Sequence, residues 1–235
     1  MLRELFWYLT GEEHIRTLRE NTKIWDAWAD SEGRLETAYG RFWRRYPVPE
    51  ISLDGEVLTN ENNKWTKREE NGQLVFDQIQ YVIDTLKELK VNPNHKNGRR
   101  MIVLAWNPGN ASISKLPPCH YTFAFNVSGN KLNCHLTQRS GDIALGIPFN
   151  LACYSLLTMM IAKECGYEVG EFAHTIIDAH IYENHIEGLK EQLTREPLKL
   201  ARINIADKPF NELTFEDITL EDYESHPVIK FEVAV

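Results

Sequence analysis

Cys119 lies in the stretch LPPCHYTF, residues 116–123, between two prolines and a histidine. Pro117 and Pro118 restrict the backbone that leads to the thiol, so they fix the direction of its side chain. A thiol held in one direction is a candidate nucleophile, and it becomes reactive when it ionises. The alternative is that Cys119 packs as a small apolar side chain. We expect that packing role for the other three cysteines, Cys134, Cys153 and Cys165.

His120 follows the thiol directly. Neighbouring residues of an extended chain point to opposite faces, so His120 need not be the base that activates Cys119. A cysteine protease requires a His that is paired in space with the thiol and an Asn or Asp that orients this His. The sequence leaves that arrangement open, but it contains no local signature of such a protease.

Two basic groups stand out in a chain whose formal net charge is −8. Arg99 and Arg100 precede an apolar run, and Arg139 lies in QRSGD, residues 138–142. Each group taken singly is typical of a solvated loop. Together with a possible thiolate they favour an anion site, because guanidinium groups bind phosphate through paired hydrogen bonds and a nearby arginine lowers the pKa of a thiol.

Further polar side chains suit the recognition of a sugar and a base. His180 and Tyr182 share one face of a predicted strand in DAHIY, where they bond a sugar hydroxyl or serve as satisfied core groups. Asn150 lies in GIPFN, in the predicted first turn of an apolar helix. Its carboxamide suits the amide edge of a pyrimidine, or an N-cap. The histidines show no zinc-ligand spacing, so we predict no metal site.

The composition disfavours several classes of protein. With 43% hydrophobic and 26% charged residues, the chain has the content of a globular protein with a core. Its negative charge argues against a general nucleic-acid binder, which needs a basic surface. No apolar run approaches the roughly 18 residues of a membrane span, and the charged opening lacks a secretory cleavage pattern. Four cysteines without CxxC spacing indicate reduced thiols, so we expect a cytoplasmic protein.

The elements that position these residues follow from hydrophobic periodicity. We predict an opening helix that continues past Gly11 and helices over 75–89, 146–166 and 184–196. Strands are predicted over 99–106, 172–182 and 198–205, and a hairpin over 121–138 turns at Ser128-Gly129-Asn130. Residues 47–73 are polar and rich in turn formers, so we expect a surface excursion. Strands and helices mix without regular alternation, which predicts an α+β fold around one core.

The motifs, taken in order, resemble the thymidylate synthase family. They are IWDAWAD, YGRFWR, RRMIVLAWNPG, LPPCH, QRSGD, LGIPFN, HTIIDAHIYENH, LTREP and HPVIKFEVAV, and they extend across the chain. The resemblance implies a single catalytic domain over residues 1–235, with a mixed β-sheet packed with helices and one sheet face forming a homodimer interface. It implies a cytoplasmic methyltransferase that converts dUMP to dTMP with 5,10-methylenetetrahydrofolate, releasing dihydrofolate.

The resemblance also assigns the chemistry. The Cys119 thiolate adds to C6 of the uracil ring, and C5 then attacks the one-carbon unit of the folate. Loss of the C5 proton, elimination of the folate and hydride transfer give the products. The catalytic residues implied are Cys119, Glu4, Tyr39, Asn150 and Arg139. Glu4 organises water and protons near O4, and Tyr39 takes part in removing the C5 proton.

The resemblance implies further residues for each ligand. Those for dUMP are Arg99, Arg100, His120, Gln138, Arg139, Ser140, Asp142, Asn150, His180 and Tyr182, with Arg99 and Arg100 donated across the dimer interface. Those for the folate are Trp25, Trp28, Leu116, Asp142, Leu145, Gly146, Phe149, Tyr182, Ala234 and Val235. Taken without the resemblance, Trp25 and Trp28 would be read as ordinary core residues.

The sequence departs from the family pattern in three places. The family begins about fifty residues earlier, so we expect its N-terminal strand and a phosphate-binding arginine loop to be absent here. Thr137 stands where a Tyr is usual, and KFEVAV replaces the usual Ala-Pro before the terminal residues. Two alternatives follow: a pyrimidine-nucleotide hydroxymethylase acting on dUMP or dCMP, or a truncated nucleotide-binding homologue of low activity. Asn150 favours uracil, and Trp25 favours methylation.

Overall fold

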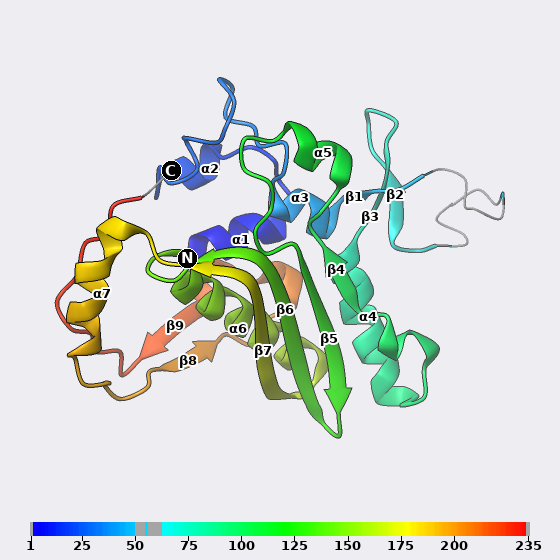
Figure 1. The fold of residues 1–235 in the computed structure, drawn as a ribbon. Coiled ribbons are helices and arrows are strands. Elements are labelled where there is room, and N and C mark those ends of the chain that lie inside the picture. The colour runs from blue at the N-terminus through cyan, green and yellow to red at the C-terminus, as the bar shows by residue number, and fades with distance from the viewer. Residues whose placement is uncertain (1, 50–54, 56–62, 234–235) are drawn as a thin grey trace.

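The computed structural model describes residues 2–49, 55 and 63–233. Its central sheet has the order β4-β5-β6-β7, with β4 at Ile102–Leu104, β5 at Thr122–Ser128, β6 at Lys131–Asp142 and β7 at Glu168–His180. β4, β5 and β6 are antiparallel neighbours, whereas β6 and β7 are parallel (Figure 1). This mixed sheet, covered by helices, confirms the predicted α+β class.

The hairpin between β5 and β6 turns at Gly129, whose φ is +61°. That left-handed conformation is accessible to glycine without strain. The parallel pair β6 and β7 needs a long crossover, and α6 (Gly146–Cys165) supplies it, lying behind the sheet in Figure 1. α6 ends at Gly166 in the left-handed region, as the sequence predicts.

From Cys153 to Ala162, α6 is mostly buried, because the sheet covers one side and α1 (Leu2–Thr10) and α4 (Gln78–Val91) pack against others. Phe149 and Leu151 in its first turns are exposed. Leu132, Cys134, Leu136 and Gln138 alternate along β6 as its buried side chains. α4 begins at Asp77, whose carboxylate accepts from the Gln80 amide N–H at 2.9 Å. The core includes the fully buried side chains of Trp43, Tyr154, Phe42, Phe123, Leu5 and Ile79.

α1 and α3 (Tyr39–Arg44) approach closely at Gly40. A Cβ added at Gly40 would overlap the backbone carbonyl of Tyr8, so glycine permits this contact. The Tyr8 ring then packs against Tyr39 and Trp43, with both centroid distances at 5.3 Å. The contact therefore places α1 against α3, including its first residue, Tyr39.

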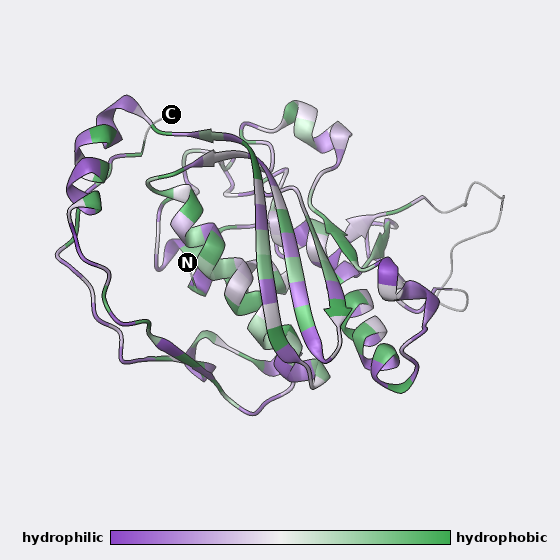
Figure 2. Ribbon diagram, turned by 60° about the horizontal axis from the view of Figure 1, so that its bottom comes forward, coloured by the Kyte–Doolittle hydropathy of each residue, from purple (hydrophilic) through white to green (hydrophobic). Residues whose placement is uncertain are grey.

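The remaining elements surround this core. They are α2 (Arg16–Arg19), β1 (Tyr46–Pro47), β2 (Thr66–Arg68), β3 (Leu74–Phe76), η1 (Lys96–Arg99), α5 (Pro108–Ile113), η2 (Glu183–His185), α7 (Ile186–Leu193), β8 (Arg202–Ile205), η3 (Phe210–Glu212), η4 (Phe215–Asp217) and β9 (Ile218–Glu221). β1, β3 and β2 form a small sheet, and β8 pairs with β9. Figure 2 shows α7 at the edge of the molecule, separated along the chain from β7 by η2.

Several predicted boundaries are wrong. The opening helix ends at Thr10, and Leu18 lies in the separate helix α2. Arg99 ends a 3-10 helix instead of starting a strand, and β8 begins at Arg202, after the apolar residues Leu198 and Leu200. The predicted excursion over 47–73 contains β2, which pairs with β3. The opening helix stops where Gly11 adopts the left-handed region, with a φ of +76°. Long-range pairing, which local periodicity does not encode, decides the strand boundaries.

Within the described residues, no helix combines the length and the apolar character that crossing a bilayer requires. The described part of the chain also contains no cluster of three or more His, Cys, Asp or Glu side chains placed to hold a metal ion.

Candidate active site

Cys119 is half-buried in the loop between α5 and β5, and its backbone is held at both polar groups. Its N–H donates to the Tyr39 hydroxyl at 2.7 Å, and its carbonyl accepts from the Arg139 N–H at 2.8 Å. The two prolines before it lengthen this rigid segment. The thiol is thus fixed in position by α3 on one side and by β6 on the other.

Arg139 reaches from β6 to the segment that carries the thiol. Its Nε donates to the Pro118 carbonyl at 3.0 Å and its Nη2 to the Pro117 carbonyl at 2.7 Å. The same Nη2 lies 3.6 Å from Cys119 Sγ. Burial raises the pKa of the Cys119 thiol above its ordinary value, and the positive charge of Arg139 opposes this shift. The guanidinium is therefore placed to stabilise the thiolate once it forms.

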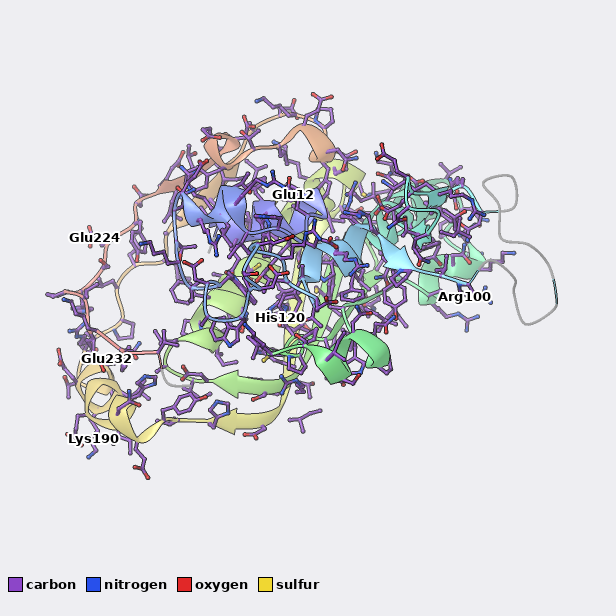
Figure 3. All side chains as sticks on the ribbon, turned by 90° about the horizontal axis from the view of Figure 1, so that it is seen from above. Glu12, Arg100, His120, Lys190, Glu224 and Glu232 are labelled. Atoms are coloured by element: carbon purple, nitrogen blue, oxygen red, sulfur yellow. The ribbon has the colours of Figure 1, made fainter. Side chains whose placement is uncertain are left out.

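His120 lies on the inner side of the same loop, near the centre of the view in Figure 3. Its Nδ1 bonds the Tyr154 hydroxyl at 2.7 Å, and its ring stacks on Tyr39 with centroids 3.7 Å apart. Burial, with a smaller contribution from His174, lowers the pKa of His120 to about 3. The imidazole is neutral near pH 7, and its contacts are with Tyr154 and Tyr39 rather than with the thiol.

Tyr39 contacts both the thiol loop and the imidazole. Burial raises the pKa of Tyr39 well above its ordinary value, so its hydroxyl stays protonated. Because this oxygen accepts from the Cys119 N–H, its own hydrogen remains for another partner. Tyr39 can therefore relay a proton through its hydroxyl, and a phenolate base is disfavoured here.

A cavity of about 680 Å³ opens beside this loop. It brings together ten residues predicted for the site: Glu4, Trp25, Trp28, His120, Asp142, Leu145, Gly146, Phe149, Asn150 and Tyr182. They come from α1, from the loop before α3, from the loop between α5 and β5, from the end of β6 and the first turns of α6, and from the segment after β7. Residues 4–28 and residues 120–182 thus contribute to one site although they are distant in sequence.

The two indoles form one wall of the cavity. The Trp25 Nε1–H donates to Glu4 Oε1 at 2.6 Å, and the rings of Trp25 and Trp28 meet edge to face at 5.7 Å. Both side chains are only partly buried. These rings therefore leave apolar surface open to a flat ligand, while the Glu4 carboxyl is held beside it.

Asn150 lies in the second turn of α6, whose N-cap position is Leu145, so the capping role is excluded. Its Oδ1 accepts from Gln138 Nε2 at 3.0 Å. Gln138 itself is 2% exposed and contacts the protein through all of its polar atoms, so we assign it a supporting position. Ser140 continues β6 and is partly exposed.

His180 ends β7 and pairs in register with Asp142, which ends β6. Its Nδ1 bonds Asp178 at 3.3 Å, and its ring lies 5.1 Å from that of Tyr182 at an angle of 84°. Asp142 Oδ1 accepts from the Ala144 N–H at 2.9 Å, which holds its carboxyl at the cavity edge. The ends of two parallel strands thus present polar groups together.

Leu116 is held by its backbone, since its carbonyl accepts from the Thr37 hydroxyl at 2.9 Å. It borders the thiol loop and does not line the cavity. Arg99 and Arg100 are exposed, and Figure 3 shows Arg100 on the opposite side of His120 from Glu232. The chain does not bring these two arginines to its own cavity. Ala234 and Val235 lie outside the described residues.

Several residues of the site have no signal in the sequence. His185 is fully buried, and its Nε2 bonds the Glu232 carbonyl at 2.7 Å, while its Nδ1 lies 3.6 Å from Asp142. It fixes the C-terminal segment, so Phe231 and Val233 line the cavity. Arg3 and Phe215 also line it and stack at 4.2 Å. The local sequence YENH does not indicate this role for His185, because its partner lies 47 residues away.

The whole chain is similar to proteins of one family. The model of the family described as thymidylate synthase matches residues 1–235. A thymidylate synthase of Haloferax volcanii is 46% identical over 284 aligned residues, which cover 100% of this chain and 80% of that protein. With a family match of this extent and a relative of this identity, the chain belongs to the thymidylate synthase family.

Proposed function

We propose that the chain transfers a one-carbon unit from 5,10-methylenetetrahydrofolate to dUMP and reduces it to a methyl group, giving dTMP and dihydrofolate. The observation that carries this proposal is the placement of one rigidly held thiol, 3.6 Å from a guanidinium, beside a cavity walled by indole rings. Family membership supports the reaction class.

The thiol acts first. Cys119 loses its proton, and its sulfur adds to C6 of the uracil ring, which places carbanion character at C5. Arg139 favours the thiolate, and together with Ser140 it binds the phosphate of the nucleotide. Because Pro117 and Pro118 carbonyls hold Arg139, the charge stays beside the sulfur. Positioning of this kind contributes to the rate by removing the need to orient the reactants.

The base and the sugar are bound by polar groups from α1, α6 and the end of β7. Asn150 bonds the uracil O4 and N3–H, and His180 with Tyr182 bonds the 3′-hydroxyl of the deoxyribose. Glu4 organises water near O4, and the Tyr39 hydroxyl relays the C5 proton. The neutral ring of His120 fixes Tyr39 by stacking, at 3.7 Å.

The folate occupies the apolar part of the cavity. Trp25, Trp28, Leu145 and Phe149 supply flat and apolar surface for the pterin and the ring that follows it. Asp142 accepts a hydrogen bond from the pterin. Gly146 leaves room at the start of α6, and Leu116 borders the thiol loop. The C-terminal segment supports this arrangement, because Phe231 and Val233 line the same cavity.

The proposal includes a cytoplasmic homodimer. One face of the central sheet carries exposed apolar side chains, among them Ile102 at 50%, Leu104 at 38% and Ile177 at 68% exposure. α6 covers the other face, as Figure 2 also shows. A second copy on the uncovered face would bury these side chains. Arg99 and Arg100 would then be contributed to the phosphate site of the partner.

In the experiment that tests this proposal, the purified protein is incubated with dUMP and 5,10-methylenetetrahydrofolate. We expect dihydrofolate absorbance to rise and the mass spectrum to show dTMP. Hydroxymethyl-dUMP as the product would instead identify a hydroxymethylase. Binding of dUMP without any dihydrofolate would identify a nucleotide-binding protein and overturn the proposal.

A further inference from the structure

Three side chains form a hydrogen-bonded chain that runs from β7 through β6 to the cavity. They are His174, Gln138 and Asn150, and the two links are 3.0 Å each. Resting on the proposed function, we propose that His174 is a positioning residue: through Gln138 it sets the orientation of the Asn150 carboxamide, and so selects a carbonyl over an amino group at C4 of the pyrimidine.

The orientation of Gln138 depends in part on a backbone carbonyl. Its Nε2 lies 3.0 Å from the Ser140 carbonyl oxygen, which can only accept a hydrogen bond. A flipped amide would place Oε1 against that oxygen, so this contact favours the orientation in which the NH2 group faces Ser140 and Asn150. Both hydrogens of Nε2 are then used, one for each acceptor. Since Gln138 is 2% exposed, water does not compete for these groups.

His174 completes this arrangement from β7. With Nε2 facing Ser140 and Asn150, the acceptor Oε1 faces His174 Nε2 at 3.0 Å. That ring nitrogen must carry a hydrogen, which it does in one neutral tautomer and also in the charged ring. The ring is half-buried and packs 5.8 Å from Phe172. Without this donor, a buried Oε1 would lack a partner, and the flipped amide would become competitive.

The orientation of Gln138 in turn determines the orientation of the carboxamide of Asn150, which lines the cavity. Its Oδ1 accepts from Gln138, so Nδ2 is the amide atom without a hydrogen-bond partner among the described residues. An NH2 group available in this way donates to a 4-carbonyl and repels a 4-amino group. A flipped Gln138 would present Oε1 to Asn150, and Asn150 would then turn its own Oδ1 toward the ligand. The hydrogen bonds that start at His174 on β7 and pass through Gln138 therefore determine the preference for uracil.

The test compares dUMP and dCMP binding by titration calorimetry of the intact chain. His174→Phe removes the donor and keeps a ring, His174→Leu removes it with less bulk, and His174→Gln retains an N–H donor. We expect the wild-type preference for dUMP over dCMP to fall about tenfold in the Phe and Leu variants and to persist in the Gln variant. Thermal unfolding midpoints identify any variant that has lost its fold.

The outcomes separate the two claims. If the wild-type chain prefers dUMP and both apolar variants keep the full preference, His174 does not set the orientation and the inference is overturned, while the proposed function stands. If the wild-type chain binds neither nucleotide, the proposed function itself fails, and the inference fails with it. A loss of affinity for both nucleotides by the same factor would reveal a merely structural role and would also overturn the inference.

Discussion

The indole of Trp25 donates to the carboxyl group of Glu4 at 2.6 Å, across 21 residues of sequence. One residue belongs to the wall assigned to the folate and the other to the proton chemistry near the base. The hydrogen bond therefore couples the position of the Glu4 carboxyl to the apolar wall, and a substitution in the wall should change the rate of the chemical step.

Trp25→Phe should lower kcat by about 10- to 100-fold, because Glu4 loses a hydrogen bond of roughly 1.5–3 kcal/mol. The phenyl ring keeps most of the apolar wall, so nucleotide affinity should change little. Trp28→Phe is the matched control, since Trp28 lines the same cavity without bonding Glu4. Steady-state kinetics of both variants measure the difference. Equal losses of kcat in the two variants would contradict the coupling.

Arg139→Gln should shift the titration of the Cys119 thiol to higher pH. Burial already raises the pKa of this thiol, and the guanidinium opposes the shift, so its removal leaves burial uncompensated. The rate of iodoacetamide alkylation in the empty protein, followed by peptide mass spectrometry, reports the thiolate fraction. In the wild-type chain the rate should rise at a pH above that of a free cysteine.

Arg139→Lys is the control for charge, since it retains a cation near the sulfur. Its alkylation profile should lie closer to the wild-type profile than that of Arg139→Gln. A Gln variant whose profile coincides with the wild type would show that Arg139 does not affect the thiolate.

Acid should destabilise the fold through His120. Burial lowers the pKa of His120 to about 3, whereas the unfolded chain binds that proton near pH 6.5. The unfolded state therefore binds more protons between these values, and stability is full above pH 6.5 and falls as the pH decreases. The slope for this single group is at most about 1.4 kcal/mol per pH unit. Between pH 6.5 and 5 the loss should be roughly 2 kcal/mol.

Urea unfolding of wild type and His120→Asn over this pH range measures that contribution. The Asn variant should be less stable overall, but its stability should depend less on pH. His226→Asn, at an exposed position, should keep the wild-type dependence. Identical pH dependence in wild type and His120→Asn would contradict the assignment.

Gly40→Ala should reduce the free energy of unfolding by about 1–3 kcal/mol or more, because the added methyl group overlaps the Tyr8 carbonyl. Since Tyr39 is the neighbour of Gly40, the shift between α1 and α3 should also lower kcat. Gly109→Ala is the matched control: a Cβ there has its nearest neighbour, Asn107 Oδ1, at 3.4 Å. Denaturant unfolding compares the two. A Gly40→Ala protein as stable as Gly109→Ala would refute the close approach.

Local sequence patterns predicted those elements that depend on local chemistry. The hairpin followed from alternation around Gly129, and α6 followed from an apolar run that ends at Gly166. A strand was predicted over residues 99–106, but the strand in the structure covers only Ile102–Leu104, because pairing with β5 decides its length. Pairs such as His185 with Glu232 could not be predicted, since no short-range pattern specifies a contact across 47 residues.

For the site, the sequence indicated which residue types matter but not what each one touches. The thiol and Arg139 were predicted to act together, and they lie 3.6 Å apart. Gln138 was assigned to the substrate, yet its amide is used by Ser140, Asn150 and His174. Burial distinguishes a ligand-binding group from a supporting one, and burial at a strand position depends on the packing of the whole sheet.

The central claim is that Cys119 bonds to C6 of the pyrimidine. Intact-protein and peptide mass spectrometry after incubation with 5-fluoro-dUMP and 5,10-methylenetetrahydrofolate test it most directly. We predict a mass increase equal to one nucleotide plus one folate, located on the peptide that contains Cys119, and no increase in Cys119→Ser. Formation of dTMP from dUMP in a parallel assay by a protein that forms no adduct with 5-fluoro-dUMP, or an adduct on Cys134, Cys153 or Cys165, would contradict the account.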